Sequence, residues 1–449
     1  MTFTAEELAR ATGGDLRRPG PAGAIVTDTR RLEPGSWFLA LRGDRFDGHE
    51  FLDHARMAGC AGVIVDSAPE DWDRGLLVVP DTLVALQDCA RFVRRDLRCP
   101  VVGITGSAGK TTTRAMVAEV LSALGRVHQT EGNLNNHIGL PLTLLAAPAD
   151  VDVLVIEMGM SAPGEIALLQ DICQPDLRLI TNVSAAHLEG TGSLQGVASC
   201  KQELFDGARE GDVLLVNQDD PLVRAMPLPE GVRVVRYGSE TGCDLRLRLA
   251  QVDAESLDTR VQLELPDGDT LVARIPSPGH HLALDALAAA AVGWALRVPK
   301  EAIAEGLSRY RPVGMRMRVE QRAGLTVLND AYNANPASMK AALDTLAGLT
   351  GRRRVALLGD MLELGATEAE AHREIAEYAA SLGLDLLGLC GPRMGAQRPD
   401  ASGLVRAEDS QALGAAVAGL LRPGDVVLVK GSRGARMERV LLQLDHEED

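Results

Sequence analysis

One stretch of this chain limits its fold more than any other, because it predicts a strand, a glycine turn and a helix in immediate succession. Residues 101–104 are an apolar run that is typical of a buried strand. A helical pattern follows from about residue 112 to residue 124. Between them lies the sequence Gly-Ser-Ala-Gly-Lys-Thr-Thr at residues 106–112. Elements in this order are typical of an α/β domain with a parallel sheet.

The turn itself predicts a phosphate-binding loop. Gly106 and Gly109 allow backbone N–H groups to approach a phosphate, and Lys110 adds a positive charge at a helix N-terminus. The Thr111 hydroxyl is suited to contact Mg²⁺. The glycine spacing is shorter than in the common pattern, because Ile104 stands where the first glycine would be. A plain strand-to-helix junction would also use glycine, but the Gly-Lys-Thr-Thr run favours phosphate binding.

Composition excludes several classes of protein. A length of 449 residues predicts two to four domains. The net charge of −16 and the aromatic content of 3% argue against a general nucleic-acid-binding protein. The seven cysteines form no Cys-x-x-Cys pair, which indicates free thiols in a reducing compartment. No apolar run is long enough to span a membrane and no secretion signal is evident, so we expect a cytoplasmic protein that is not membrane-embedded.

Strand and helix patterns divide the chain into three predicted domains. Residues 1–82 predict a small α/β domain, and residues 83–312 alternate strands and helices as in a mostly parallel, doubly wound sheet. Short alternating runs between residues 245 and 275 predict an antiparallel element in this central domain. Residues 313–449 repeat the α/β pattern and predict a Rossmann-like domain. In such sheets, ligands bind at the carboxyl ends of the strands.

Two polar loops of the N-terminal domain lie beside predicted strand ends. Their aspartate, threonine and arginine side chains suit a phosphate-bearing ligand, and they suit a solvated turn surface equally well. Both interpretations stay open at this point. The candidate ligand-binding residues in these loops are Thr27, Asp28, Thr29, Arg30, Arg45, Asp47, Gly48 and His49.

Polar residues also follow predicted strands of the central domain. Glu157 ends the strand at residues 151–156, where a carboxylate could hold Mg²⁺ directly or through water, or cap a helix. His187 follows the strand at residues 177–183 and suits a structural role as well as a ligand role. Composition alone makes Lys201 a surface lysine. Three asparagines in one loop suit hydrogen bonds to phosphate or amide groups, or turn formation: Asn133, Asn135 and Asn136.

Together these motifs resemble those of the Mur ligases, which are ATP-dependent, amide-bond-forming enzymes of peptidoglycan synthesis. The resemblance covers nearly the whole chain. The matching stretches are residues 27–30, 43–49, 106–113, 132–141, 156–159, 187–190, 330–336, 359–365 and 430–433. The loop at 132–141, the Tyr-Asn-Ala-Asn-Pro run and the stretch at 359–365 are typical of the family member that adds D-alanyl-D-alanine.

The resemblance implies a central ATPase between an N-terminal domain for the UDP end of the substrate and a C-terminal domain for the incoming dipeptide. It implies a monomer that joins D-alanyl-D-alanine to UDP-N-acetylmuramoyl-tripeptide through an acyl phosphate, with ATP and Mg²⁺. The alternatives are a sibling ligase that adds one amino acid, a folate-extending ligase, or a non-catalytic nucleotide-binding protein.

The resemblance also implies roles for individual residues. The catalytic residues would be Lys110, Glu157, His187 and Lys201, with Lys201 carbamylated and thereby turned into an anion. The Mg²⁺ ligands would be Thr111, Glu157, His187 and Lys201. The ATP contacts would be Thr105, Gly106, Ser107, Ala108, Gly109, Lys110, Thr111, Thr112, Asn136, Asp285, Arg316, Asp330, Tyr332 and Asn335. The substrate contacts would be Asn133, Asn135, Lys430, Ser432 and Arg433, besides the N-terminal residues named above.

The predicted alanine-rich helix at residues 282–296 departs from the family pattern at its start. The family usually has asparagine at the positions that Leu282 and Asp285 occupy here. Asp285 can still accept a hydrogen bond from the adenine amino group, whereas the Leu282 side chain cannot.

Overall fold

The computed structural model describes residues 1–43, 46–186 and 188–444. Two residues with predicted roles, Arg45 and His187, lie outside these described residues. The chain forms two compact units, each assembled from several segments. The first unit contains Met1–Gly103, Gly125–Gly159 and Glu165–Asp176, and the second contains Ile104–Leu124, Met160–Gly164 and Leu177–Asp449. The three domains and their boundaries near residues 82 and 312 stay predictions.

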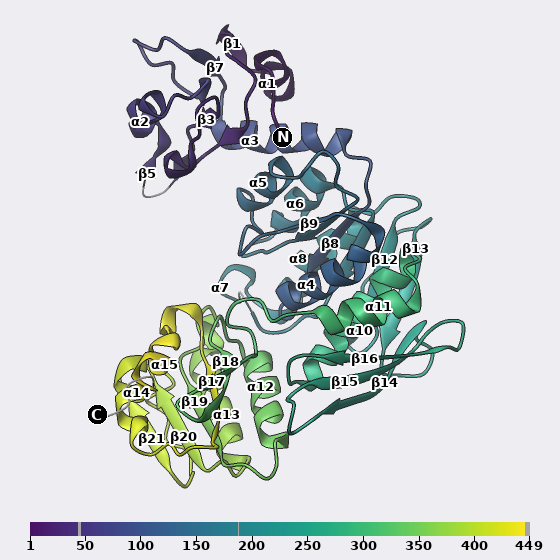
Figure 1. The fold of residues 1–449 in the computed structure, drawn as a ribbon, viewed down its shortest axis with the longest axis vertical. Helices are drawn as coiled ribbons and strands as arrows, with labels where there is room; N and C mark the ends of the chain where they lie inside the picture. The colour runs from purple at the N-terminus through teal and green to yellow at the C-terminus, as the bar shows by residue number, and fades with distance from the viewer. Residues whose placement is uncertain (44–45, 187, 445–449) are drawn as a thin grey trace. The chain divides into compact units, whose positions relative to one another are not determined.

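A five-stranded sheet forms the start of the first unit (Figure 1). Its strands run in the order β1-β7-β6-β3-β2, with β1 antiparallel to β7 and the other pairs parallel. Helix α1 (Ala5–Thr12) begins at a capping box between Thr4 and Glu7, and Gly13 forms its C-cap in the left-handed conformation. The strands of this sheet are β1 (Asp15–Arg18), β2 (Ile25–Val26), β3 (Trp37–Leu39), β6 (Gly62–Val65) and β7 (Gly75–Val78). Strands β4 (Arg42–Gly43) and β5 (Phe46–Asp47) form a separate antiparallel pair.

The ring of Trp37 fills the space over two glycines in this sheet. Trp37 is fully buried, and its Nε1–H donates to Pro21 O at 2.9 Å. A Cβ atom on Gly62 or on Gly75 would lie 2.6 Å from the indole ring. The two glycines therefore provide the room that the large ring needs in the core.

The rest of the first unit contains the Glu157 strand and its covering helices. Strands β9 (Val127–Gln129) and β10 (Val153–Glu157) are parallel neighbours. A 3₁₀ turn, Gly48–Phe51, is capped by Asp47 and leads into helix α2 (Leu52–Met57). The remaining helices are α3 (Thr82–Asp96), α5 (Gly139–Leu145) and α6 (Glu165–Cys173).

The strand, turn and helix predicted first are present with shifted ends. Strand β8 (Val101–Thr105) leads into helix α4 (Lys110–Leu121), which begins two residues earlier than expected because Gly109, in the left-handed region, forms its N-cap. Strand β11 (Leu177–Ile180) ends before residue 183, because Thr181 and Asn182 turn to bond the phosphate loop.

The second unit continues from β11 with a run of paired strands. Strands β11 to β14 are parallel, and β15 and β16 add the predicted antiparallel element. The strands are β12 (Val213–Asn217), β13 (Arg233–Gly238), β14 (Leu245–Val252), β15 (Thr259–Glu264) and β16 (Thr270–Ile275). The helices are α7 (Leu188–Thr191), α8 (Leu194–Asp206), α9 (Pro221–Arg224), α10 (His280–Ala295) and α11 (Lys300–Arg309). Both α10 and α11 pack against α4, and a Cβ atom on Gly306 would lie 2.6 Å from Val120 Cα.

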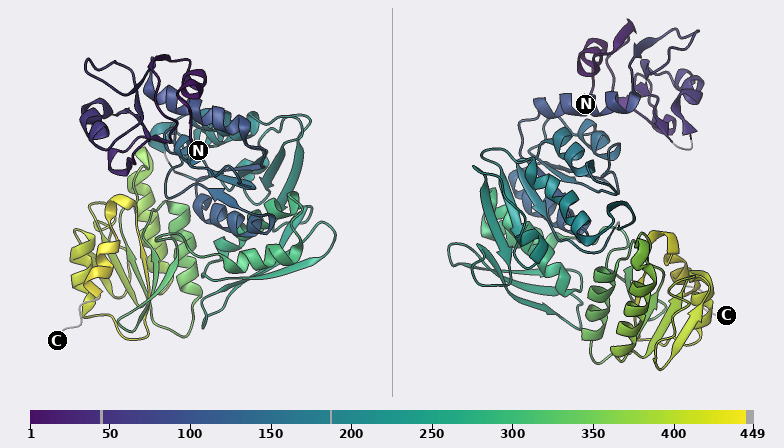
Figure 2. Two further views of the ribbon diagram at one scale, coloured as in Figure 1. Left: turned by 45° about the horizontal axis from the view of Figure 1, so that its top comes forward. Right: turned by 180° about the vertical axis from the view of Figure 1, so that it is seen from behind.

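The C-terminal part of the second unit is a six-stranded sheet in the order β17-β18-β22-β19-β20-β21, in which only β17 is antiparallel. Its helices cover both faces (Figure 2): α12 and α13 pack on one face, and α14 and α15 on the other. The strands are β17 (Arg318–Arg322), β18 (Leu325–Asp330), β19 (Arg354–Leu358), β20 (Leu386–Cys390), β21 (Leu404–Ala407) and β22 (Val426–Lys430). The helices are α12 (Pro336–Gly348), α13 (Glu368–Ser381), α14 (Ser410–Ala418) and α15 (Glu438–Leu444).

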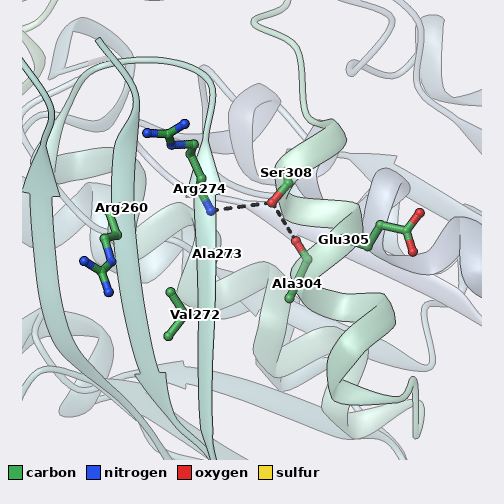
Figure 3. A pocket seen from close by; sticks show the side chains of 7 residues that line it. All are labelled: Arg260, Val272, Ala273, Arg274, Ala304, Glu305 and Ser308. Atoms are coloured by element: carbon green, nitrogen blue, oxygen red, sulfur yellow. Dashed lines mark hydrogen bonds between the residues drawn. The ribbon is translucent and has the colours of Figure 1, made fainter. Parts of the chain in front are cut away.

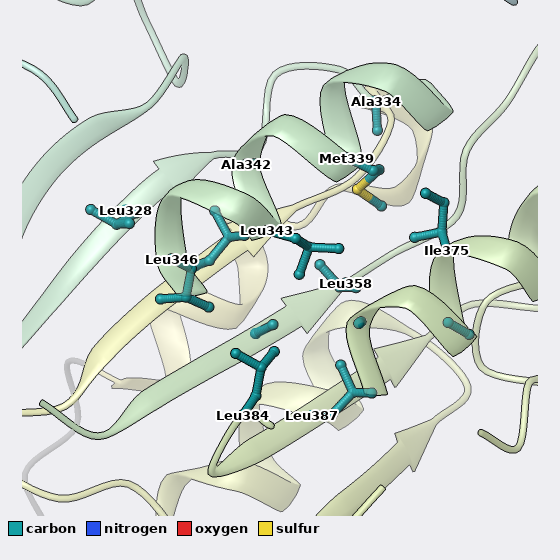
Figure 4. Packing of buried hydrophobic residues seen from close by; sticks show 14 of the residues in the cluster. Leu328, Ala334, Met339, Ala342, Leu343, Leu346, Leu358, Ile375, Leu384 and Leu387 are labelled. Carbon is teal, nitrogen blue, oxygen red and sulfur yellow. The ribbon is translucent and has the colours of Figure 1, made fainter. Parts of the chain in front are cut away.

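Leucine and methionine side chains from α12 and the sheet interlock beneath this helix (Figure 4). Met339, Leu343 and Leu346 recur at helical spacing along α12 and pack with Leu328 and Leu358. This mixed α/β architecture with predominantly parallel sheets confirms the predicted fold class. Among the described residues, no helix is long and apolar enough to cross a membrane.

Candidate active site

The phosphate loop joins β8 to α4 through two glycines in backbone conformations that other residues rarely adopt. Gly106 has φ 154° and Gly109 has φ 78°. A Cβ atom on Gly106 would collide with the Thr181 hydroxyl, and one on Gly109 would collide with Asp285 Oδ1. Both positions therefore require glycine, and the loop runs directly into the N-terminus of α4, which favours an anion.

The residues that follow β11 hold this loop in place. Thr181 Oγ1 donates to Ala108 O at 2.6 Å, and Asn182 Oδ1 accepts from Ala108 N–H at 2.9 Å. Ser107 N–H donates to Asn182 O at 3.0 Å, and Ser107 Oγ accepts from Ser184 N–H at 2.9 Å. Because the Ala108 N–H is used within the loop, the first turn of α4 is the place where a phosphate would find N–H donors.

Lys110, the first residue of α4, folds back over the loop. Its Nζ donates to Gly106 O at 2.7 Å, so the ammonium lies against the turn that the sequence predicts to bind phosphate. Thr105, Thr111 and Thr112 around it are all buried. The loop therefore combines a positive charge, threonine hydroxyls and a helix N-terminus in one small volume.

Lys201 is not the surface lysine that composition predicts. It lies on the inner side of α8 with Val197 and Leu204 and is 1% exposed. Burial lowers the pKa of its ammonium well below the usual value, and the nearby charge of Lys110 lowers it further. Among the described residues, no carboxylate contributes to this shift. Burial and the charge of Lys110 thus both favour the uncharged amine over the ammonium at this position.

Helix α10 carries Asp285 to the back of the loop. Asp285 is 8% exposed, and its Oδ1 accepts from Thr113 Oγ1 at 2.9 Å. Burial raises the pKa of this carboxyl to about 7. Leu282, the other departure from the family pattern, is buried in the core. One turn before Asp285, His281 has a buried Nδ1 atom without a hydrogen-bond partner in the described chain, and burial lowers its pKa to about 4.

The carboxyl ends of β18 and β22 are joined by a buried ion pair. Lys430 Nζ donates to Asp330 Oδ2 at 2.5 Å and to Asn333 O at 3.1 Å. The Arg316 guanidinium lies over the Tyr332 ring, 3.6 Å from its centroid. The structure therefore brings three of the predicted ATP contacts in this region to one edge of the C-terminal sheet.

Two more predicted residues at this edge have their side chains bonded to the protein itself. Asn335 caps α12 and accepts from Ser338 N–H at 2.8 Å. Ser432 Oγ accepts from Leu362 N–H at 2.9 Å and donates to Ala334 O at 3.2 Å. Ser432 thereby connects its own loop with the loops that contain Leu362 and Ala334.

Arg433 differs from its neighbours because its side chain reaches solvent. The guanidinium is 61% exposed and pairs with Glu438 at 3.0 Å. Of the predicted substrate contacts at residues 430–433, Arg433 is therefore the one with a charged group that a dissolved ligand can reach.

In the first unit, Glu157 is a buried carboxylate held in one orientation. It is 2% exposed, and its Oε1 accepts from Asn135 Nδ2 at 2.9 Å. Its backbone N–H donates to Thr130 Oγ1 at 2.9 Å. Asn136 has a different role, because its Oδ1 accepts from Gly139 N–H at 2.8 Å at the start of α5. The remaining asparagine of this loop, Asn133, is exposed.

The predicted substrate loops of the N-terminal sheet are ordered by their own ion pairs. Asp28 caps a 3₁₀ turn and pairs with Arg30 at 2.7 Å, which lowers the pKa of the Asp28 carboxyl to about 2. Thr27 and Thr29 flank this aspartate and are partly exposed. In the second loop, Asp47 Oδ1 accepts from His49 N–H at 2.9 Å across Gly48. Arg42, which the sequence did not single out, pairs with Asp66 at 2.6 Å.

Sequence reasoning missed several residues that shape the site. Thr181 and Asn182 carried a signal, because they are polar and directly follow an apolar strand. No sequence pattern indicated the role of Thr113, because its hydrogen-bond partner Asp285 lies 172 positions away in the chain. His372 likewise gave no signal, although its Nε2 accepts from Met361 N–H at 2.9 Å and so orders the loop after β19.

A hollow on the second unit lies apart from these residues. It is formed by β15, β16 and α11 and is lined by Arg260, Arg274 and Ser308 among others (Figure 3). Arg260 and Arg274 are cross-strand partners in the antiparallel pair of β15 and β16. No predicted site residue lines it.

The fold and the site correspond to a known class of enzyme. Residues 104–293 match the Mur ligase middle domain, and residues 315–433 match the Mur ligase, glutamate ligase domain. The chain belongs to the Mur ligase family. It is therefore an ATP-dependent, ADP-forming amino-acid ligase, as the sequence predicts.

Two relatives that align over nearly the whole chain share the name of one particular ligase. The chain is 36% identical to the UDP-N-acetylmuramoyl-tripeptide–D-alanyl-D-alanine ligase of Bacillus subtilis (strain 168), over 98% of each chain. It is 37% identical to the Escherichia coli (strain K12) enzyme of the same name, over 99% of this chain and 98% of the relative.

Solved structures agree with the sequence relatives. A crystal structure of MurF from Acinetobacter baumannii matches with a TM-score of 0.93 and 31% identity, over 100% of this chain and 99% of that one. MurF ligase from Thermotoga maritima in complex with ADP matches with a TM-score of 0.85 and 29% identity, over 94% and 97% of the two chains.

Proposed function

We propose that this ligase joins D-alanyl-D-alanine to UDP-N-acetylmuramoyl-tripeptide and yields the pentapeptide precursor of peptidoglycan. The observation that carries this proposal is the full-length similarity to relatives that bear that activity in their names. A folate-extending ligase is less well supported, because the folylpolyglutamate synthase of Mycobacterium tuberculosis is only 20% identical and shares the fold alone.

The chemistry needs activation of a carboxylate, which is a poor electrophile. A tripeptide carboxylate oxygen attacks the γ-phosphorus of ATP, ADP leaves, and an acyl phosphate forms. The amine of D-alanyl-D-alanine then attacks the acyl carbon, phosphate leaves, and the amine loses one proton. Lys110, whose ammonium lies against Gly106 O, offsets the phosphate charge in both steps.

The residues present fit a Mg²⁺ ion. Glu157 is a buried carboxylate with one oxygen already oriented by Asn135, and oxygen ligands of this kind suit Mg²⁺. Glu157 and the Thr111 hydroxyl would hold the ion, together with His187 and modified Lys201. When bound, Mg²⁺ would neutralise phosphate charge.

The burial of Lys201 supports its modification to a carbamate. Its neutral nitrogen would attack the carbon of CO₂, form an N–C bond and release one proton. The product is an anion near the charge of Lys110, which interacts with Lys201. Carbamylation thus turns a buried amine into a metal ligand.

Three parts of the chain would divide the work of binding. Residues 1–82 would bind the UDP end, residues 83–312 would bind ATP, and residues 313–449 would bind the dipeptide and close the nucleotide site. The contacts to ATP would come from the phosphate loop and from Asn136, Asp285, Arg316, Asp330, Tyr332 and Asn335. Those to the substrates would come from the loops at residues 27–30 and 45–49 and from Asn133, Asn135, Lys430, Ser432 and Arg433.

The enzyme would act as a monomer in the cytoplasm. All seven cysteines are free thiols, which fits a reducing compartment where ATP is available.

The test is ADP release by the purified full-length protein with ATP and Mg²⁺. We expect release only when UDP-N-acetylmuramoyl-tripeptide and D-alanyl-D-alanine are both present. Lys110→Ala is expected to abolish it, whereas the exposed Lys300→Ala is expected to leave it unchanged. Release driven by folate and glutamate, or by a single amino acid, would overturn the proposal.

A further inference from the structure

The carboxyl of Asp285 lies directly behind the phosphate loop. Its Oδ1 accepts a hydrogen bond from Thr113 on α4 and packs so closely on Gly109 that no side chain fits there. Helices α10 and α4 pack side by side in the second unit (Figure 1), so this contact is supported along both helices. Asp285 therefore touches the loop at the glycine that begins α4 and, one turn later, at Thr113.

We propose that Asp285 is a positioning residue of the phosphate loop, and that the loop binds nucleotide most tightly when this carboxyl carries its proton. The inference rests on the proposed nucleotide function of the loop. This role differs from a hydrogen bond to adenine. Asp285 lies behind the phosphate loop, where a negative charge on its carboxyl would disfavour the binding of phosphate.

Among the described residues, the neutral Thr113 hydroxyl is the hydrogen-bond donor to the Asp285 carboxyl. Burial raises the pKa of this carboxyl to about 7, and the Thr113 hydrogen bond opposes that shift only in part. No charged side chain among the described residues contributes to the shift. The carboxyl therefore changes charge within the physiological range.

The groups that face Asp285 from neighbouring elements keep one charge state over this range. Tyr237 on β13 and Tyr310 after α11 are buried, and burial raises the pKa of both phenols, so both stay neutral. His281, one turn earlier on α10, has its pKa lowered to about 4 and also stays neutral. From α4 the facing group is the Thr113 hydroxyl, and α4 also carries the cations Lys110 and Arg114. Asp285 is thus the group here that titrates near pH 7.

The sign of the effect follows from Coulomb's law. Above pH 7 the ionised carboxyl lies behind a loop that must attract phosphate anions, and it repels them through a medium of low dielectric. Below pH 7 the neutral carboxyl keeps the Thr113 contact without the repulsion. An asparagine has the same shape and is always neutral, so it would keep the contact and lose the pH dependence.

The experiment measures the dissociation constant of MgADP for the full-length protein between pH 6 and pH 9, without the other substrates. For the native protein we expect binding to weaken by about tenfold across this range, which corresponds to a shift of about one pKa unit on binding. For Asp285→Asn we expect the dissociation constant to change less than twofold over this range, apart from the change caused by titration of the nucleotide itself. At pH 9 this variant should bind MgADP more tightly than the native protein.

Thr113→Val provides a matched second variant. It removes the hydroxyl that stabilises the ionised carboxyl, so the midpoint of the binding profile is expected to move to higher pH. Native binding that tightens with pH, or equal profiles for native protein and Asp285→Asn, would overturn the proposal. Because MgADP binding needs no peptide substrate, this outcome is independent of whether the enzyme uses D-alanyl-D-alanine.

Discussion

Lys430 and Asp330 form a buried ion pair that joins the carboxyl ends of β22 and β18. Lys430 is 2% exposed, and its Nζ is held between the Asp330 carboxylate and Asn333 O. Neighbouring parallel strands place these two residues at the same register position. The pair therefore fixes the loop at residues 331–335, which carries the predicted nucleotide contacts Tyr332 and Asn335.

Lys430→Ala is expected to lower the free energy of unfolding of the C-terminal sheet by about 1–3 kcal/mol, because the partly buried Asp330 carboxylate loses its ion-pair partner and, among the described residues, keeps only the Met317 N–H. Urea denaturation followed by circular dichroism measures the loss. The matched control is Arg274→Ala, which breaks the solvent-exposed pair with Asp258 and should cost less than about 1 kcal/mol. Equal effects of the two substitutions would contradict a structural role for the Lys430 pair.

Gly62→Ala is expected to destabilise the N-terminal sheet by about 1–3 kcal/mol, since its Cβ would lie 2.6 Å from the rigid Trp37 ring. Thermal unfolding followed by circular dichroism measures the loss. Gly348→Ala, at the end of α12, has no atom within 4 Å of the added Cβ and should be neutral or stabilising. A neutral Gly62→Ala would show that the ring has room to move.

Lys201 gives a prediction that depends on dissolved CO₂. Activity is expected to fall in buffer depleted of CO₂ and to return when bicarbonate is added. Lys201→Arg cannot form the carbamate under these conditions and should lose at least about 100-fold in turnover, with or without bicarbonate, because one charge-stabilising group is missing. Full activity of Lys201→Arg would show that a carbamate is not needed.

The Asp285 carboxyl makes stability depend on pH in a defined direction. Its folded pKa of about 7 lies above the usual 3.8, so the folded state holds the proton more tightly than the unfolded chain. This stabilisation is complete below pH 3.8, decreases as pH rises, and is lost above about pH 7.

Asp285→Asn should therefore raise the free energy of unfolding more at pH 8 than at pH 5, by up to about 4 kcal/mol at pH 8. Urea denaturation at the two pH values measures this difference. Asp53→Asn, whose side chain is 87% exposed, is the control and should change stability by less than about 0.5 kcal/mol at either pH. A variant that is less stable than the native protein at pH 8 would contradict the charge assigned to Asp285.

Local patterns were sufficient to predict several strands, such as β8, β10 and β11, the glycine turn before α4, and the α/β class. Gly106, Gly109 and Lys110 lie between a strand and a helix that are adjacent in sequence. The motif and its structural context could therefore be recognised from consecutive residues. Helix ends were less predictable: α4 begins at Lys110 because Gly109 adopts a left-handed conformation, which residue type permits but does not require.

Burial and long-range pairing were not predictable. Lys201 is a surface lysine by composition, and only the packing of α8 shows that it is buried. Ser432 is an evident ligand candidate by its position in a loop, yet its hydroxyl bonds Leu362 and Ala334 from distant segments. The contact of Asp285 with Thr113 joins two helices far apart in sequence. These features depend on tertiary structure that local periodicity does not encode.

The most direct test of the central claim is the mass of the product. The purified protein, incubated with ATP, Mg²⁺, UDP-N-acetylmuramoyl-tripeptide and D-alanyl-D-alanine, is expected to convert the tripeptide into a species heavier by one dipeptide residue, with one ADP formed per product. Lys110→Ala should give no product. ADP formation without this mass increase, or a product that carries a single amino acid, would contradict the assigned reaction.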